Sequence, residues 1–517
     1  MSFINPVKRG YLALETWFNI SFGNVWNPLY NLGTLTFFFF WVVLVSGLYL
    51  FIFFDTSLTG AYASVEYMTH DQWYAGGVMR SLHRYASDAA VITIILHMFR
   101  EFALDRYRGF RWFSWFTGVP TLWFVITLGI TGYWLVWDEL ALYVAIQSSQ
   151  LMDALPLIPA SMTRNFLASQ INDRFFTLMA FLHLLGQPVI LFFALWIHVK
   201  RLSDVSILPP RGLAVGSFIA LLVLSLLEPA VSHDIADTQS TPAMLNLDWF
   251  YLNIYPLLDY WTAGYVWVLT LGITVFLMMM PWLPKKKMGP AAEVHLDECN
   301  GCEQCAKDCP FDAITVQKRT DGARWETEVV VQESLCAACG ICVGSCHSSN
   351  PFRHSQQDLV TGIDMPQSPI NDIRNQTETA LSKLQGENKI IVFGCDNAID
   401  FSDLKSPNIA VVSFFCVGMI PPTLVEYALK KGADGVFVTG CRTGDCYFRH
   451  GNKWLDERFA TKRQPILRKR ADRARINIFR AAETDCKQLK RELDQFQHHL
   501  TQLKQNETAG VSGVSDE

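Results

Sequence analysis

The chain has 517 residues, of which half are apolar, 13% aromatic and only 18% charged, a composition typical of a membrane protein that also carries a soluble portion. Its length leaves room for several domains, and its net charge of −5 argues against a nucleic-acid partner. No short apolar run with a small-residue cleavage site follows Lys8 and Arg9, so we expect no removable signal peptide.

Six stretches are long and apolar enough to cross a membrane. They cover about 33–54, 79–101, 116–137, 176–199, 212–231 and 261–283. The loops on one side are basic, through Arg100, Arg106, Arg108, Arg111, Lys200, Arg201, Arg211, Lys285, Lys286 and Lys287. The positive-inside rule therefore predicts that both termini are cytoplasmic. Residues 10–30, with alternating aromatics and few charges, predict a helix lying on the cytoplasmic membrane surface.

Four histidines occur in matched pairs inside the second and fourth of these spans. His83 and His97 are fourteen residues apart, and His183 and His198 fifteen. Fourteen residues of α-helix make almost four turns and rise about 21 Å, so each span presents two imidazoles on nearly one face. Two such helices packed together would hold two stacked haems, one between His83 and His183 and one between His97 and His198. Four unrelated hydrogen-bonded histidines are the alternative, which leaves the paired spacing to chance.

The second and third spans read RSLHRYASDAAVITIILHMFREF and RWFSWFTGVPTLWFVITLGITGYWLVWDEL. Over residues 10–205 the sequence resembles cytochrome b of the bc-type quinol oxidoreductases, especially the short form of chloroplasts and cyanobacteria. The resemblance implies two haems b at the histidine pairs. The short form also attaches a third haem covalently through a cysteine near the first helix. This chain has no cysteine there, so we expect no c-type haem.

Glycines and arginines accompany the histidines. Gly33 and Gly47 on the first span, and Gly118 and Gly132 on the third, are fourteen residues apart and fall at the two haem levels. A flat macrocycle between helices needs positions without a Cβ, although ordinary small-residue helix packing is the alternative. Arg80 and Arg84 flank His83, where the family uses arginine against haem propionates. An interfacial anchor is the other reading of these arginines.

The loop before the sixth span reads STPAMLNLDWFYLNIYPLLDY. It resembles the Pro-Glu-Trp-Tyr segment that lines the outer quinol site in the family, with Leu247, Asp248, Trp249 and Phe250 at those four positions. The resemblance implies that Asp248 accepts a proton from quinol, as a positioned carboxylate can. A solvated loop acid is the alternative.

All thirteen cysteines lie at or after Cys299. Eight form a doubled bacterial ferredoxin signature, in which the fourth cysteine of each run ligates the other cluster. One predicted [4Fe–4S] cluster takes Cys299, Cys302, Cys305 and Cys346, and the second takes Cys336, Cys339, Cys342 and Cys309. Such usage indicates a reducing compartment rather than disulfides. A pair of structural zinc ions is the alternative.

The segments KIIVFG, IAVVSF and GVFVTG predict strands of a small parallel α/β domain, with a helix near 421–431. Three cysteines follow these strands, at the carboxyl edge where such folds place their sites. The segment GADGVFVTGCRTGDCYFRHGN resembles the delta subunit of methyl-viologen-reducing hydrogenase. This implies a [2Fe–2S] cluster on Cys395, Cys416, Cys441 and Cys446, and an FAD-containing partner like heterodisulfide reductase. The family has a further cysteine where Ala398 stands, and a structural zinc is the alternative. Cys486 is interpreted as a spare thiol.

We therefore predict a multidomain protein in which an all-α transmembrane haem-binding bundle of six spans precedes an α+β bacterial ferredoxin domain and a small α/β parallel-sheet iron–sulfur domain with a helical C-terminus. The predicted parts are 1–30 (surface helix), 31–205 (cytochrome b), 206–288 (two further spans), 289–353 (ferredoxin), 354–388 (linker), 389–505 (delta-subunit-like, helical and charged over about 455–505) and 506–517 (disordered tail). The expected function is electron transfer between a cytoplasmic flavoprotein and membrane quinone, within a larger complex that contains a homodimer. The alternative is a membrane anchor and relay without its own quinone site.

Overall fold

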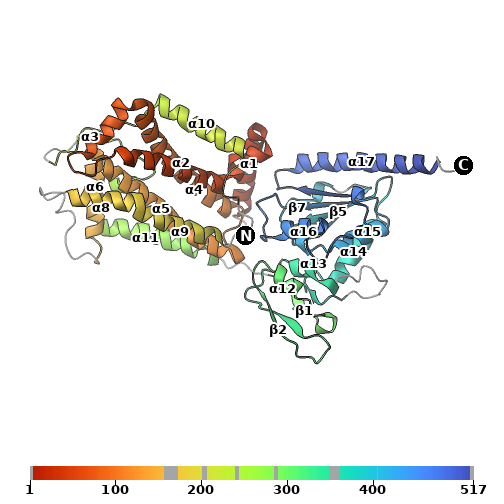
Figure 1. Cartoon of the computed structure of the whole chain (residues 1–517). Coiled ribbons are helices and arrows are strands. Elements are labelled where there is room, and N and C mark those ends of the chain that lie inside the picture. The colour runs from red at the N-terminus through yellow and green to blue at the C-terminus, as the bar shows by residue number, and fades with distance from the viewer. Residues whose placement is uncertain are drawn as a thin grey trace. The chain divides into compact units, whose positions relative to one another are not determined.

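The computed structural model describes residues 4–156, 173–200, 206–238, 244–283, 289–348, 360–404 and 406–512. The chain divides into two compact units, Met1–Lys286 and Lys287–Glu517, which are shown in Figure 1. Some predicted features lie outside the described residues: Arg201, Lys285, Lys286, Lys287 and the final residues 513–517.

The first unit is helical. Its longer helices are α1 (Ile4–Trp26), α2 (Leu32–Phe53), α4 (Val78–Ala103), α5 (Trp112–Val136), α6 (Glu139–Asp153), α8 (Asp173–Phe181), α9 (Gln187–Lys200), α10 (Arg211–Leu227) and α11 (Ala263–Met279). Between them lie α3 (Ala61–Glu66) and the short 3₁₀ or π turns η1 (Pro28–Tyr30), η2 (Tyr67–Asp71), η3 (Trp73–Gly77), η4 (Gly109–Arg111), η5 (Leu182–Gly186), η6 (Tyr255–Asp259) and η7 (Met280–Trp282).

Four helical segments in the described ranges are long and apolar enough to cross a membrane: Leu32–Phe53, Gly109–Val136, Phe176–Lys200 and Ala263–Trp282. The helix α4 is 26 residues long but carries Arg80, Arg84 and Asp88, and α10 has only 17 residues. The structure therefore supports a membrane protein with four apolar spans, and the presence of six transmembrane helices stays a prediction.

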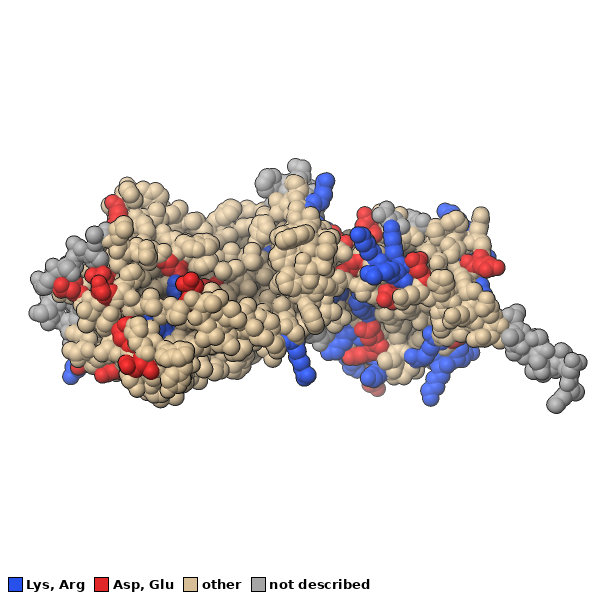
Figure 2. Space-filling view, turned by 90° about the horizontal axis from the view of Figure 1, so that it is seen from above, with Lys and Arg blue, Asp and Glu red and all other residues tan. Residues whose placement is uncertain are grey.

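The surface of the first unit fits an apolar surrounding. Phe192 on α9, Val215 on α10 and Val268 on α11 all expose more than half of their surface, which lipid would cover. Figure 2 shows a broad face almost free of charged side chains, with acidic groups gathered at one end of the unit. Inside, α2 packs along α4, where the Thr36 hydroxyl donates to Thr93 Oγ1 at 2.9 Å.

The first part of the second unit is built from two short antiparallel pairs. Strand β1 (Glu293–Val294) pairs with β4 (Ile363–Asp364), and β2 (Ile314–Lys318) pairs with β3 (Thr327–Val331). Two single-turn helices, α12 (Gln304–Asp308) and α13 (Ile341–Ser345), follow the cysteine loops. Residues 363–382, which fall within the predicted linker, thus form β4 and the helix α14 (Ile370–Ser382).

The rest of the second unit is a parallel sheet between two helical layers. Its strand order is β6 (Ile409–Phe414), β5 (Ile390–Cys395), β7 (Gly435–Gly440) and β8 (Ile476–Arg480). Alternate residues of β5 serve opposite faces, because Ile391 and Phe393 pack toward the layer of α14, α15 (Pro422–Lys430) and α16 (Gly451–Phe459). Ile390 and Val392 pack toward α17 (Cys486–Ser512), which covers the other face (Figure 1).

Two features near the C-terminus correct the sequence analysis. The charged stretch 455–505 was expected to be helical, but β8 lies inside it and pairs in parallel with β7. The predicted disordered tail is also wrong for 506–512, because α17 continues to Ser512. Leu489, Leu493, Phe496 and Leu500, spaced three or four residues apart, bury one stripe of α17 against the sheet and anchor this helix.

One apolar core runs through both cysteine-rich parts of the second unit. Ile314 and Val343 from the first part belong to the same buried cluster as Phe393, Val412 and Leu424 from the sheet and its helices. The contact is close, since a Cβ on Gly344 would lie 2.2 Å from the carbonyl oxygen of Gly418. These parts therefore form one packed body.

Candidate functional site

The structure brings together both predicted histidine pairs. His83 on α4 and His183 on η5 face each other with ring centres 6.3 Å apart and an angle of 62° between the rings. A metal bound to one nitrogen of each ring, at about 2 Å on either side, fits this separation. His97 and His198 lie close enough for their charges to interact. The first pair thus fits a group held from two sides, and the ligand role of all four histidines stays a prediction.

Neighbouring helices orient these imidazoles through Nδ1. His83 Nδ1 lies 3.0 Å from the carbonyl oxygen of Val43 and 3.2 Å from Ser46 Oγ on α2. Similar contacts of 3.2 Å join His183 Nδ1 to Thr131 Oγ1 and His198 Nδ1 to Thr117 Oγ1, both on α5. Hydrogen bonds at Nδ1 fix the ring and leave Nε2 for a metal, as in other histidine-ligated sites.

Each predicted glycine lies against one of the four rings. The nearest ring atom, Cε1, would lie at 2.9 Å from a Cβ on Gly47 (His83), 3.0 Å on Gly132 (His183), 3.2 Å on Gly118 (His198) and 3.7 Å on Gly33 (His97). The glycines therefore make room for the imidazoles themselves, whereas the sequence analysis assigned that room to the macrocycle. Sequence reasoning also missed the hydroxyl that precedes three of them, in Ser-Gly, Thr-Gly and Thr-Gly pairs.

Arg80 and Arg84 are both engaged by protein groups. Arg80 donates to Thr69 Oγ1 and to Ser232 Oγ, and it lies 3.6 Å from Glu66. These contacts tie α4 to the loops at its start, which fits the anchor reading of this arginine. The expected contact with haem propionates stays a prediction.

Asp248 is a buried member of a polar cluster. Its side chain is 5% exposed and accepts hydrogen bonds from Arg84, from the Tyr133 hydroxyl at 3.1 Å and from the backbone N–H groups of Phe250 and Tyr251. It is therefore not a solvated loop acid, because four donors surround it. The structure gives it a role in holding the loop 248–251 against α4 and α5. Its proposed role toward quinol needs one of these donors to give way.

The two ferredoxin-like loops share one backbone conformation. Gly301 and Glu303 in the first run have φ values of 66° and 60°, and Ala338 and Gly340 in the second have 52° and 74°. Left-handed residues at matching positions curl each loop so that successive N–H groups can point inward, which is the concave arrangement that iron–sulfur sites use. The repeated geometry fits two similar clusters.

The cysteine side chains gather in the two predicted sets. Burial raises the pKa of Cys305, and Cys346, Cys302 and Cys299 lie close enough to add to that shift. Burial likewise raises the pKa of Cys339 to about 12, with further contributions from Cys309 and Cys336. Fourth cysteines are thus placed crosswise, as the ferredoxin pattern predicts.

The carboxyl edge of the parallel sheet collects the remaining four cysteines. Cys395 ends β5 and its Sγ lies 3.8 Å from Sγ of Cys441, which follows β7. A hydrogen bond with Cys446, together with burial, raises the pKa of Cys416 well above its ordinary value. A Cβ on Gly451 would lie 2.0 Å from Cys416 Sγ, so the start of α16 closes over this thiol.

Within the described residues, no group of three or more His, Cys, Asp or Glu side chains converges as a single metal ion would require. A cluster spreads its cysteines over several irons, so its ligands need not meet at one point. The paired arrangement of Cys395 with Cys441 and of Cys416 with Cys446 suits two irons, each held by two thiolates. Cys486 is exposed at the start of α17, apart from this edge in sequence and element.

Three family models match the chain: cytochrome b/b6/petB over residues 19–205, the 4Fe-4S dicluster domain over 298–350 and the delta subunit of methyl-viologen-reducing hydrogenase over 387–504. Cytochrome b6 of Mesostigma viride is 32% identical over 134 residues, which are 26% of this chain and 62% of that protein. Cytochrome b6 of Prochlorothrix hollandica is 30% identical over 132 residues, or 26% and 59%. The chain thus spans about three fifths of the length of these relatives.

A solved structure titled "Hyperthermophilic respiratory Complex III" matches 49% of this chain and 75% of its own, with a TM-score of 0.42 and 18% identity. The three family matches follow one another without overlap. The chain is a fusion, in this order, of a region similar to cytochrome b, a 4Fe-4S dicluster region and a region similar to the delta subunit of methyl-viologen-reducing hydrogenase.

Proposed function

We propose that this protein is a membrane-bound electron-transfer subunit that relays electrons between a cytoplasmic flavoprotein oxidoreductase and the quinone pool. The observation that carries the proposal is the pair of facing histidines 6.3 Å apart, on a chain that also holds three gathered sets of cysteines. When bound, two haems b, two [4Fe–4S] clusters and one [2Fe–2S] cluster would supply one-electron chemistry. The protein contributes positions, hydrogen bonds and burial.

The residues that would hold these groups follow from the contacts above. All four histidines would serve as ligands, and His83, His183 and His198 would offer Nε2, because a neighbouring helix occupies their Nδ1. Four of the eight thiols, Cys305, Cys346, Cys339 and Cys342, are buried, two in each set, and their burial lowers the reorganisation that accompanies a change of charge.

The loop from Cys441 to Cys446 offers the entrance for the soluble partner. Thr443 and Gly444 in this loop are exposed, while Cys441 beneath them is buried. An FAD-containing protein like heterodisulfide reductase would dock here, as the delta-subunit match supports. In this arrangement both termini are cytoplasmic, six helices cross the membrane and the protein acts as a homodimer within a larger complex.

The second candidate function is an anchor and relay without its own quinone site. It is favoured by Asp248, whose carboxylate is already held by Arg84 and Tyr133. A general base needs a free lone pair within hydrogen-bond reach of the proton it removes. In the relay, electrons would leave to another redox protein from the haem between His83 and His183, the outer haem.

One experiment separates the two functions. The full-length protein in its native membrane is treated with excess quinol, and the reduction of haem b is followed with and without a quinone-site inhibitor. Inhibitor-sensitive reduction supports the quinone-linked function, and its absence supports the relay. His183→Leu removes one ring of the outer pair, with His70→Gln as a control because His70 is an exposed histidine bonded to Glu66. Normal quinone turnover in His183→Leu would overturn a role for the outer haem.

A further inference from the structure

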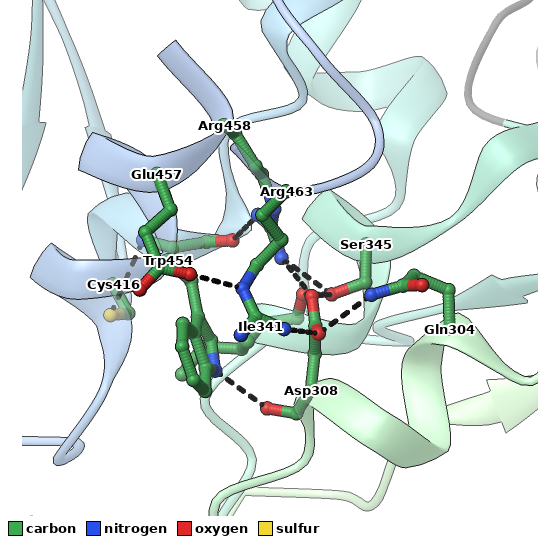
Figure 3. A network of polar contacts seen from close by, with 10 residues as sticks. Gln304, Asp308, Ile341, Ser345, Cys416, Trp454, Glu457, Arg458 and Arg463 are labelled. Atoms are coloured by element: carbon green, nitrogen blue, oxygen red, sulfur yellow. Dashed lines mark hydrogen bonds and ion pairs between the residues drawn. The ribbon is translucent and has the colours of Figure 1, made fainter. Parts of the chain in front are cut away.

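A single arginine joins three cysteine-bearing segments of the second unit: the two ferredoxin-like runs and the loop after β6. Arg458 on α16 has no exposed surface, and its guanidinium donates to three oxygens from distant parts of the chain (Figure 3). The acceptors are Asp308 Oδ2 at 2.8 Å, Ser345 Oγ at 2.5 Å and the Gly418 carbonyl at 2.7 Å. No solvent screens these contacts, so they are charge-assisted bonds in a low-dielectric interior.

Each of these acceptors stands beside a predicted ligand of a different iron–sulfur site. Asp308 precedes Cys309, Ser345 precedes Cys346, and Gly418 follows Cys416 by two residues. The backbone N–H of Gly418 in turn donates a hydrogen bond to Cys416 Sγ, with a nitrogen–sulfur distance of 3.4 Å. One guanidinium therefore holds a residue close in sequence to one ligand of each site, through two side chains and one backbone carbonyl.

The partner of Arg458 is itself firmly held. Asp308 has no exposed surface, and its second oxygen, Oδ1, accepts from Arg463 Nη1 at 2.6 Å. Arg463 is balanced by Glu457 at 2.6 Å and stacks over the Trp454 ring at 3.4 Å, as Figure 3 shows for the polar contacts. The two arginines and two carboxylates are thus neutral as a set, and of the two arginines only Arg458 has no solvent access.

The guanidinium keeps one donor unused. Arg458 Nε is buried and has no hydrogen-bond partner among the described residues. A buried N–H without an acceptor carries a free-energy cost, so native structures rarely leave one. Cys416 is near enough for its charge to act on Arg458. The group that Cys416 would hold offers sulfur atoms, which accept hydrogen bonds from N–H donors of this kind.

Cys416 is also the point at which two sites approach each other. Its charge interacts with that of Cys339 in the second ferredoxin-like set. Met419, three residues after Cys416, packs against Gly340, which follows Cys339, and a Cβ on Gly340 would lie 2.6 Å from the methionine sulfur. Electrons would cross here singly, one site being oxidised as the other is reduced, with no bond formed or broken.

We propose that Arg458 is a positioning residue for electron transfer: it fixes the spacing of the three iron–sulfur sites and makes the site of Cys416 easier to reduce. This inference rests on the iron–sulfur assignment of the proposed function. A fixed positive charge and an N–H donor both stabilise the more negative, reduced state of a cluster.

The test is a redox titration of the full-length protein, purified anaerobically in detergent and followed by electron paramagnetic resonance. In Arg458→Met, the reduced-to-oxidised ratio of the Cys416 site at a fixed potential should fall about tenfold, which is about 59 mV for one electron. Arg475→Gln serves as the control, because Arg475 pairs with Asp472 and Glu507 at the surface. That control should titrate like the wild type.

Two outcomes overturn the inference. One is an unchanged reduction potential of the Cys416 site in Arg458→Met when the iron content shows that all three clusters are present. The other is an equal shift of this potential in Arg475→Gln. If Arg458→Met loses its clusters, Arg458→Lys decides, since lysine keeps the charge but lacks the planar fork. In Arg458→Lys, the reduction potential of the Cys416 site should shift in the same direction by a smaller amount, and the magnetic coupling between clusters should change. A variant with the coupling and the potential of the wild type would refute the inference. A wild-type protein without three cluster signals would refute the proposed function instead.

Discussion

Adding one methyl group at Gly47 should selectively damage the outer haem site. A Cβ there would lie 2.9 Å from Cε1 and 3.2 Å from Nδ1 of His83. Ordinary carbon contacts lie at about 3.5–4.0 Å, so either the ring or α2 must shift by roughly 0.6 Å. The ring cannot shift freely, because its Nδ1 is bonded to Val43 and Ser46 on the same helix as Gly47.

The magnitude follows from two opposing effects. Overpacking of this kind costs about 1–3 kcal/mol. Alanine is better than glycine in a helix by about 0.8–1.0 kcal/mol, so overall stability changes little. The steric cost falls on the ring that would bind iron, however, and about 1–3 kcal/mol corresponds to a loss of roughly 5–150-fold in affinity. Haem occupancy should therefore change more than the unfolding temperature.

Gly33→Ala is the matched variant on the same helix. Its Cβ would lie 3.7 Å from His97 Cε1, an ordinary contact. Haem content per chain and the reduced-minus-oxidised spectrum of each purified variant are the measurements. Gly47→Ala should lose about half of its haem, while Gly33→Ala keeps the wild-type content. Equal haem content and equal spectra in the two variants would show that the ring contacts do not control haem binding.

Three further predictions concern other parts of the chain. Gly451→Ala puts a Cβ 2.0 Å from Cys416 Sγ. It should abolish the electron paramagnetic resonance signal of the [2Fe–2S] cluster while both [4Fe–4S] signals remain. Loss of all three signals together would contradict this prediction. Arg100→Met removes the ion pair of 3.1 Å with the buried Glu15 and should destabilise the membrane unit by about 3–5 kcal/mol. The measurement is the unfolding temperature in detergent, which should fall and be partly restored in Arg100→Lys. Burial raises the pKa of Cys339 to about 12, so without a cluster this thiol holds its proton at neutral pH, and cluster binding must release that proton. Chelator should therefore bleach the clusters faster at pH 6 than at pH 8. A bleaching rate independent of pH would count against this prediction.

Local patterns predicted much of the structure. The runs IAVVSF and GVFVTG form β6 and β7 with the predicted bounds, because short apolar β-branched runs between turns suit a buried parallel strand. The histidine spacing was readable for the same reason, since His83 and His97 lie on one helix and His183 and His198 on one helical segment. Strand β8 was missed because INIFR is only five residues long and stands between charged segments.

Long-range contacts explain what the sequence could not predict. Arg458 and Asp308 are 150 residues apart, and nothing in either local sequence distinguishes them from surface charges. The sequence left a solvated loop acid open as the alternative for Asp248 for the same reason, although Arg84 and Tyr133 reach it from two separate helices. Burial of a charge is decided by which elements meet, and that information lies outside any single window of sequence.

The shared core of the second unit also has a consequence for inheritance. Two segments that match separate families now bury Ile341, Val343 and Met419 without leaving any of these side chains measurably exposed. Either segment alone would present this apolar surface to water, so the pair should melt in one cooperative transition and behave as a single foldon. Recombination that exchanges only one of these segments would remove half of the shared core. We therefore expect the two segments to be inherited together.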